Sequence, residues 1–451
     1  MKRTNLKGFQ ILTHLGCKSY RSPNPWLLGR FGQVAHENAA DFVSHPRMFK
    51  PGMPVGSEMI RDNATAIAAE LMLEFARRTG LHPASRNTQR YLWTDAFAVC
   101  NFLELFARTN NELYRTCAMD LVDQVHQVLG HYRADDYRHG WISGLGEDPG
   151  KRHPTVGGLR IGKPLKERGA GEPIDERLEW DRDGQYFHYL TKWMHALCRA
   201  AIVSDHPAHA EEALELGEAA FRGFAGKSAS GNLIGIYWKM STDLSRPLTF
   251  AMGLHDALDG LVTFREVQDV IAKTHPKTSD SDLTGAITSL SNLCRSRDWG
   301  TSDPLGIGSL LFDACRLSQL PQRHGDDRLL KEITNAFENG VTALLAGQLL
   351  TRPASQRLAF RELGLAIGLK AIPTIVELNK NARKIGPHLP EILQSQYQSL
   401  AEEIISAWLP CAQTADQLWQ AHQDINDVML ATALIPDTFL SVDERIPLKA
   451  F

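Results

Sequence analysis

The stretch DAFAVCNFLELFARTNNELYRTCAMDLVDQVHQVLG, residues 95–130, decides the fold. In its first half, apolar side chains recur at positions 96, 99, 103 and 106, a spacing typical of one face of a helix. The pair Asn110–Asn111 interrupts this pattern, and a second helical run over 112–129 ends at Gly130, a residue type that often follows a helix. The stretch therefore predicts two helices that pair through a short polar turn.

The same helical period dominates the rest of the chain. It predicts about a dozen helices, which pack either as an open α-solenoid or as a closed (α/α)6 toroid. A solenoid should show a repeat of fixed length, whereas these hairpins vary in length, so we expect the all-α toroid with few short strands. The remaining helices are expected at 57–79, 184–203, 208–224, 256–273, 281–296, 305–318, 326–349, 355–371, 374–385, 391–408 and 413–433, and short strands at Leu233–Met240 and within 155–163.

One long irregular insertion, residues 131–182, interrupts the helical pattern. It shows no helical period and holds nine of the chain's 35 glycines. A loop of this length is usually functional or disordered, and apolar residues at 141, 142, 159, 161 and 180 favour a functional, anchored loop over a mobile excursion. We expect 1–56 to be an extended N-terminal segment packing on the toroid, 57–440 to be the toroid, and 441–451 to be a C-terminal tail.

The composition of the chain argues against several classes of protein. Lys plus Arg number 49 and Asp plus Glu 52, giving a net charge of −3, which argues against a nucleic-acid or anionic-membrane partner. The seven cysteines are scattered without a CxxC pair, as in reduced cytosolic proteins. We find no signal peptide and no apolar run long enough to span a membrane, so we expect a cytoplasmic protein. Phosphate-loop and dinucleotide motifs are incomplete, so we expect no cofactor and no metal; the oligomeric state stays open.

The strongest candidate for chemistry is the sequence EWDRDGQY, residues 179–186. Three carboxylates within five residues repel one another, which can raise a carboxyl pKa toward the range that a general acid needs. Trp180 and Tyr186 offer flat apolar faces suited to a sugar ring. The alternative is structural, because Asp183 could simply cap the following helix. Asp181 and Asp183 are therefore the first candidates for a catalytic acid.

A second carboxylate is needed for glycoside chemistry. Asp95 is the first candidate and Asp256, beside His255, the next; capping of a helix start is the alternative for each. The residues expected to bind substrate are Trp93, Trp141, Glu179, Trp180, Arg182, Tyr186, His188, Trp193, Arg152 and His153.

The helix expected at 184–203 carries a basic stripe. His188, Lys192, His195 and Arg199 follow one another at spacings of four, three and four residues, so they share one face. This face is either solvated or a wall that meets an anionic substrate, with Tyr189 and Trp193 as its aromatic part.

Paired helices together with YLWTD (91–95) and EWDRDG (179–184) resemble the six-hairpin glycosidase-like superfamily. That superfamily includes unsaturated-glucuronyl hydrolases and, in a related toroid, N-acylglucosamine 2-epimerases. The resemblance is architectural over most of the chain and local at these two segments. It implies aromatic-rich loops around one mouth of the toroid, with Asp or Glu residues as catalysts, or His in the epimerases.

Three functions remain open. The first is a glycoside hydrolase acting on a small-molecule or oligosaccharide substrate, with Asp181 or Asp183 as acid and Asp95 as base. The second is a sugar epimerase or isomerase that uses His188, His195 or His255. The third is a non-catalytic helical scaffold that binds a protein partner.

Overall fold

The computed structural model describes residues 57–85, 88–204, 206–274, 283–295, 297–381, 391–414 and 416–442. The expected N-terminal segment 1–56 and most of the expected tail 441–451 lie outside these residues. The helices are α1 (Ser57–Arg78), α2 (Leu92–Thr109), α3 (Glu112–Leu129), α4 (Glu147–Arg152), α5 (Glu176–Asp181), α6 (Phe187–Val203), α7 (Ala208–Phe224), α8 (Asp256–Thr274), α9 (Thr284–Cys294), α10 (Pro304–Gln319), α11 (Asp326–Ala346), α12 (Ala359–Lys370), α13 (Ile372–Asn381), α14 (Glu391–Gln413), α15 (Gln417–Gln420), α16 (Gln423–Leu434) and α17 (Asp437–Leu440).

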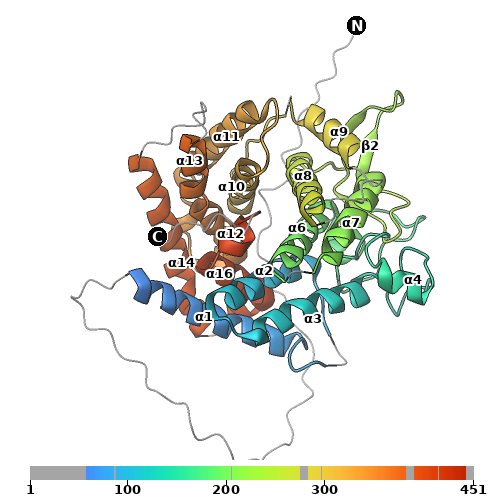
Figure 1. Cartoon of the computed structure of the whole chain (residues 1–451), viewed down its shortest axis with the longest axis horizontal. Coiled ribbons are helices and arrows are strands. Elements are labelled where there is room, and N and C mark those ends of the chain that lie inside the picture. The colour runs from blue at the N-terminus through green and yellow to red at the C-terminus, as the bar shows by residue number, and fades with distance from the viewer. Residues whose placement is uncertain are drawn as a thin grey trace, which may run out of the picture. The chain divides into compact units, whose positions relative to one another are not determined.

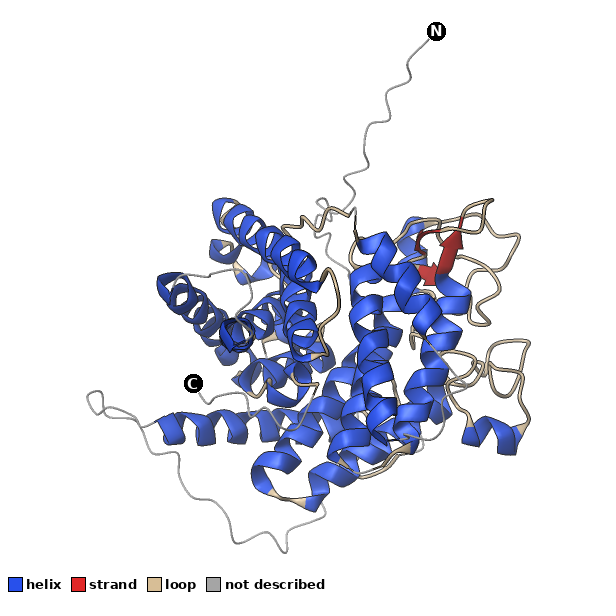
Figure 2. Ribbon diagram, turned by 45° about the horizontal axis from the view of Figure 1, so that its top comes forward, coloured by secondary structure: helices blue, strands red, loops and turns tan. Residues whose placement is uncertain are grey.

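Six of these helices form a closed inner ring. Helix α2 packs on α6, α6 on α8, α8 on α10, α10 on α12, α12 on α16, and α16 returns to α2 (Figure 1). A second layer surrounds them, with α1 and α3 against α2, α7 against α6, α9 against α8, α11 against α10 and α14 against α12. Helices also dominate the ribbon in Figure 2. The predicted all-α (α/α)6 toroid is confirmed.

The pattern of buried residues distinguishes the helices of the inner ring from those of the outer layer. Every residue of α2 from Leu92 to Leu105 is buried, because the ring and the outer layer cover all its faces. Helix α3 buries only a stripe from Tyr114 to Leu129, as an outer helix with one solvent face should. Helices α10 and α12 meet where a Cβ on Gly308 would stand 2.2 Å from the carbonyl oxygen of Gly364, so glycine permits the close approach. No described helix is both long and apolar enough to cross a membrane.

The six inner helices begin at the same end of the ring. Ile161 links the starts of α2 and α6, because its carbonyl accepts from Leu92 and its amide donates to Gly184. Side-chain contacts join the other starts: His255 to the carbonyl of Trp299, Arg361 to Asp303, and Phe360 to His422. We call this end the N-terminal rim.

Helix α17 packs inside the ring at the end opposite the N-terminal rim. Its Phe439 ring stacks on Phe97 of α2, with centroids 4.3 Å apart, and its carbonyl bonds to His195 Nε2 at 2.9 Å. Thr438 donates to the Glu104 carboxylate through both its amide and its hydroxyl. The ring interior is therefore filled at this end by the chain's own C-terminal helix.

The insertion 131–182 differs partly from expectation. It contains the short helices α4 and α5, where no helical period was predicted. Trp141, Ile142, Leu159 and Ile161 are buried as expected, but Trp180 is 45% exposed and was wrongly expected to be an anchor. The strands are β1 (Gln185–Tyr186), paired antiparallel with β4 (Lys239–Met240), and β2 (Ala225–Lys227), paired antiparallel with β3 (Leu233–Ile236). The described part of 155–163 contains no strand.

Candidate functional site

Aromatic side chains gather at the N-terminal rim. Trp93, near the start of α2, faces Tyr189 of α6, with ring centroids 5.4 Å apart, and His188 at 6.0 Å. Tyr186 of β1 stacks on His188 at 5.5 Å. The Tyr91 and Tyr189 hydroxyls are 2.5 Å apart. The starts of two inner helices and one strand thus form a continuous aromatic surface.

Asp256 opens α8 beside this surface. Its Oδ1 lies 3.8 Å from His188 Nδ1, and the residue is only 6% exposed. Burial, reinforced by the negative charge of Asp259, raises the pKa of the Asp256 carboxyl to about 8. A Cβ added to Gly253 would overlap Asp256 Oδ2, so the loop before α8 holds the carboxyl closely. Asp256 therefore keeps its proton at neutral pH.

The pKa of His188 is shifted in the opposite direction. Burial lowers the pKa of its imidazole to about 4, although 28% of the side chain is exposed, because the Nδ1 atom itself is buried. The ring is neutral at pH 7, so it offers one nitrogen as donor and one as acceptor. Asp256 and His188 therefore form a neutral acid beside a neutral base.

Several buried polar atoms at the rim have no hydrogen-bond partner within the described part of the chain. Native proteins pair nearly all such atoms, so a cluster of exceptions points to a ligand or ordered water. The atoms at the rim are Trp93 Nε1, Tyr186 Oη, His188 Nδ1, Asp256 Oδ2 and Trp299 Nε1.

Asp259 lies one turn below Asp256 on the same face of α8. Burial would raise the pKa of its carboxyl, but Lys192 and Arg316 outweigh burial and hold that pKa below its usual range. Lys192 Nζ lies 2.7 Å from Asp259 Oδ1, Arg316 Nη2 lies 3.0 Å from it, and Thr191 donates to Oδ2 at 2.6 Å. Asp259 is therefore an ionised carboxylate with its oxygens engaged.

The basic stripe of α6 turns into the ring. Lys192, His195 and Arg199 are buried, so a solvated face is ruled out. Lys192 pairs with Asp259, and His195 Nδ1 lies 2.7 Å from Glu266 Oε1. Within this stripe, His188 lies at the rim, while Lys192 is held in an internal ion pair and His195 in an internal hydrogen bond to Glu266.

The three other predicted carboxylates have different surroundings. Asp95 is buried, accepts the Tyr91 amide and lies 3.4 Å from Arg90; burial still raises its pKa to about 6. Asp183 is fully buried, and its carboxylate accepts from Arg160 at 2.5 Å and from the Gly162 amide at 3.0 Å.

Asp181 ends α5 as an exposed residue. The capping alternative describes Asp95, which accepts the amide of Tyr91 at the start of α2. It is wrong for Asp183, because Tyr186 precedes α6 without a side-chain cap and the Asp183 carboxylate instead holds Arg160 and the amides of Gly162 and Gly184.

The predicted substrate-binding residues separate into two groups. Trp93, Tyr186 and His188 lie together at the rim. Trp193 donates to His126 of the outer helix α3, and Trp141 packs on His131, so both face away from the rim aromatics.

Charged residues of the insertion also contact one another or the outer layer. Glu179 is buried between Arg168 and Lys239, and Arg182 pairs with Glu172. Arg152 is exposed at the end of α4. His153 Nδ1 contacts Glu215 of the outer helix α7 at 2.6 Å. These positions support the insertion and do not join the rim cluster.

His255 lies on the rim, next to Asp256. Its Nε2 hydrogen-bonds to the carbonyl of Trp299 at 3.1 Å, and burial lowers its pKa, so it too is neutral. The sequence reasoning missed Trp299 and Asp259. The spacing of Asp256 and Asp259 by three residues was the available signal, since it places two carboxylates on one helix face.

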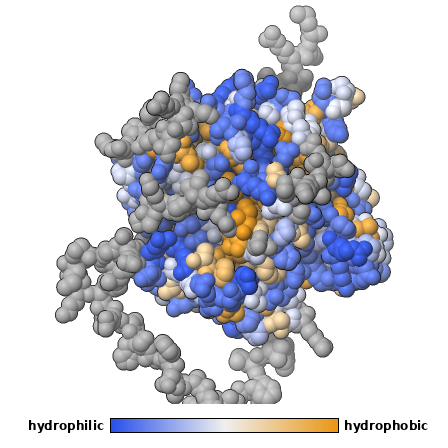
Figure 3. Space-filling model, in the orientation of Figure 1, coloured by the Kyte–Doolittle hydropathy of each residue, from blue (hydrophilic) through white to orange (hydrophobic). Residues whose placement is uncertain are grey.

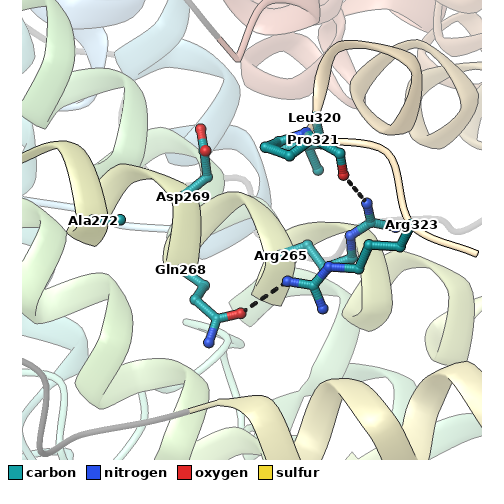
Figure 4. Close-up of a pocket in the computed structure, with 7 residues that line it drawn as sticks. All are labelled: Arg265, Gln268, Asp269, Ala272, Leu320, Pro321 and Arg323. Atoms are coloured by element: carbon teal, nitrogen blue, oxygen red, sulfur yellow. Dashed lines mark hydrogen bonds between the residues drawn. The ribbon is translucent and has the colours of Figure 1, made fainter.

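A pocket of about 220 Å3 lies far along α8 from the rim (Figure 4). Its charged groups are mutually satisfied: Arg265 binds Asp326 and the carbonyl of Pro321, and Arg323 binds Gln268. We therefore place the candidate site at the rim and not in this pocket. Its lining residues are Arg265, Gln268, Asp269, Ala272, Leu320, Pro321 and Arg323. In the described ranges, no group of three or more His, Cys, Asp or Glu is arranged to hold a metal ion.

No protein-family model matches the chain, and a search of curated proteins finds no match. Among solved structures, an inactive variant of an α-1,6-mannanase from Salegentibacter, in complex with α-1,6-mannotriose, is similar. It shares 12% identity, with a TM-score of 0.45, over 84% of this chain and all of that chain.

Proposed function

We propose that the chain is a carbohydrate-active enzyme, with glycoside hydrolysis as its reaction and Asp256 as its general acid. The observation that carries the proposal is the Asp256 carboxyl, which is protonated at neutral pH and has a buried oxygen without a partner among the described residues. The surrounding Trp93, Tyr189 and Trp299 supply flat apolar surface and indole donors, the combination that suits a sugar.

Asp256 and His188 together account for every proton transferred in the proposed hydrolysis. Asp256 gives its proton to the glycosidic oxygen, and the bond from that oxygen to the anomeric carbon breaks. Water adds to the anomeric carbon, and its proton goes to neutral His188 Nδ1. The 3.8 Å contact between Nδ1 and Asp256 Oδ1 then returns the proton to the carboxylate. Burial, with the Asp259 anion adding to it, favours the protonated form of Asp256.

Epimerisation or isomerisation of a sugar is the second candidate. It is favoured by one observation: the base next to Asp256 is an imidazole at 3.8 Å, whereas hydrolases with paired carboxylates separate them by about 5 to 9.5 Å. A neighbouring acid and base suit proton exchange at adjacent atoms of one sugar.

The test uses aryl glycosides and reducing oligosaccharides in heavy water and in 18O-labelled water. Release of the aglycone, together with 18O at the anomeric carbon of the released sugar, supports hydrolysis. Solvent deuterium in an uncleaved sugar supports epimerisation. The variant Asp256→Asn should lose either activity by about 10²- to 10⁴-fold, the usual contribution of a general acid. Asp120→Asn, an exposed carboxylate on α3, is the matched control. Full activity of the Asp256 variant would sink the assignment.

A further inference from the structure

Helix α17 is held inside the ring by contacts with several inner helices at once. The Phe439 ring stacks on Phe97 of α2 and meets Phe312 of α10 edge-on, with centroids 4.3 and 5.1 Å apart. Gln319 of α10 donates to the carbonyl of Leu440 at 2.7 Å. The space-filling view of Figure 3 shows mostly hydrophilic surface with an apolar area near its middle. The C-terminal helix thus braces the ring from within.

His195 of α6 adds a polar contact to α17, and both of its ring nitrogens face hydrogen-bond acceptors. Nε2 lies 2.9 Å from the carbonyl oxygen of Phe439, and Nδ1 lies 2.7 Å from the Glu266 carboxylate of α8. A neutral imidazole has one N–H and one lone pair, so either tautomer would leave an acceptor against an acceptor at one contact. Both contacts are hydrogen bonds only when the pair holds one proton beyond those of a neutral imidazole and a carboxylate.

The surroundings make this additional proton costly to hold. The side chains of His195 and Glu266 are each 1% exposed. Burial lowers the pKa of the imidazole, Glu266 opposes this lowering, and the charges of Arg316 and Arg199 add to it. Arg316 Nη1 also lies 3.3 Å from Glu266 Oε2, which favours the ionised carboxylate. The closed arrangement is therefore poised to lose its proton as pH rises.

The other titratable groups around the pair keep one charge state above neutral pH. Burial raises the pKa of the Cys100 thiol of α2 to about 12, and it raises the pKa of Cys198 on α6 as well, so both thiols stay neutral. Asp313 of α10 lies 2.7 Å from Arg316, and burial raises the pKa of its carboxyl to about 6. Asp313 is therefore ionised above neutral pH.

A separate charged group lies beside the start of α17. Arg108 of α2 contacts Asp437 at 2.7 Å and Glu104 at 2.5 Å. Burial, and then the charge of Glu104, raises the pKa of Asp437, so ionisation of Asp437 also favours release of α17 as pH rises. A variant that leaves this group intact retains its contribution, which then cancels in a comparison with the native protein.

We infer that His195 and Glu266 form a proton-dependent latch that holds α17 inside the ring while the pair carries the additional proton, and that frees α17 when the proton leaves. The proton passes to solvent, and a neutral imidazole and a carboxylate remain, which cannot satisfy both contacts. The latch does not depend on the proposed reaction, because neither residue takes part in the proton transfers of Asp256 and His188.

The direction of the pH effect follows from the protons bound in each form. A solvent-exposed histidine releases its proton at about pH 6.5, so above that pH the open form binds one proton fewer than the closed form. Raising the pH therefore favours opening. The equilibrium constant for opening should rise about tenfold per pH unit, or about 100-fold between pH 6.5 and 8.5.

The experiment measures backbone hydrogen exchange in residues 437–442 by mass spectrometry on the full chain. Glu266→Gln is the decisive variant, because its amide donates to Nδ1 while neutral His195 donates from Nε2, so both contacts persist without the additional proton. The ratio of the native exchange rate to the variant rate at the same pH should rise about tenfold per pH unit from about 6.5 to 8.5. Glu215→Gln is the matched control, since its partner His153 is 50% exposed, and its ratio should not change with pH.

A native-to-Glu266→Gln ratio that stays constant with pH would overturn the inference, because the pair would then hold no additional proton. A Glu215→Gln ratio that rises equally would overturn it too, since the response would not belong to the latch. His195→Gln removes the same titration and takes the place of Glu266→Gln if that protein does not fold. If neither folds, the native rate divided by the rate of the urea-unfolded chain at each pH must show the rise, and a constant quotient would contradict the latch.

Discussion

Replacing Asp256 by Asn should make the protein inactive and, at the same time, more stable at neutral pH. In the folded protein the carboxyl keeps its proton up to about pH 8, whereas in the unfolded chain it releases that proton near 3.8. Between these pH values the unfolded state is favoured as pH rises, since it binds fewer protons. Each pKa unit corresponds to about 1.4 kcal/mol, so at pH 7 the carboxyl costs the fold about 4 kcal/mol as an upper value.

An amide of the same shape does not ionise and so removes this cost. Urea unfolding of both proteins at pH 5, 7 and 8 gives the free energy of unfolding at each pH. The advantage of Asp256→Asn should be small at pH 5 and should grow by a few kcal/mol toward pH 8, while hydrolysis falls by about 10²- to 10⁴-fold. An advantage that stays constant with pH would mean that Asp256 is ionised in the fold, and the acid role would be refuted.

The activity should be highest on a plateau between about pH 4 and pH 8, because the imidazole of His188 must be neutral and Asp256 protonated; a kcat/KM profile that rises through pH 8 would contradict this. Asp183→Asn should cost about 3 to 5 kcal/mol of unfolding free energy in urea, since it leaves the Arg160 cation buried without its carboxylate. Asp135→Asn, at a side chain that is 55% exposed and paired with Arg133, should cost less than about 1 kcal/mol. Asp181→Asn should retain turnover of a short aryl glycoside within about twofold, because the exposed side chain is not in the proton path; complete loss would return the acid role to Asp181.

Much of the fold follows from the sequence because periodicity is local. The bounds expected for α3 and α7, 112–129 and 208–224, agree with the structure, since polar turns and glycine mark their ends clearly. The run expected at 413–433 instead divides into α15 and α16 around His422, which no local signal announces. The closure of the ring was inferred from the absence of a repeat, and it depends on contacts between α16 and α2 that join the two ends of the toroid.

The site was harder to predict because a carboxylate's charge partner is rarely its sequence neighbour. The density of acids at 179–183 drew attention to Asp183, but the cation that neutralises it, Arg160, stands 23 residues earlier. Asp256 became a candidate because of its place beside His255 at a helix start. Its neutrality could not be found in that way, since it depends on burial and on a charge network that reaches from α6 to α10.

Asp256 and Asp259 show how two carboxyls in the first turn of one helix take opposite charge states. A helix N-terminus favours a carboxylate by about 1 kcal/mol, which would tend to ionise both residues. At Asp259, Lys192 and Arg316 add to that preference, and the carboxylate is fixed as an anion. At Asp256 no cation contacts the carboxyl among the described residues, and the raised pKa of about 8 corresponds to roughly 6 kcal/mol, several times the helix contribution. Burial is the larger cause of the raised pKa of Asp256, the Asp259 anion adds to it and Lys192 opposes it, so the carboxyl of Asp256 should stay protonated at neutral pH in a Lys192→Met variant, whereas Asp259 loses a cation that holds its own pKa down.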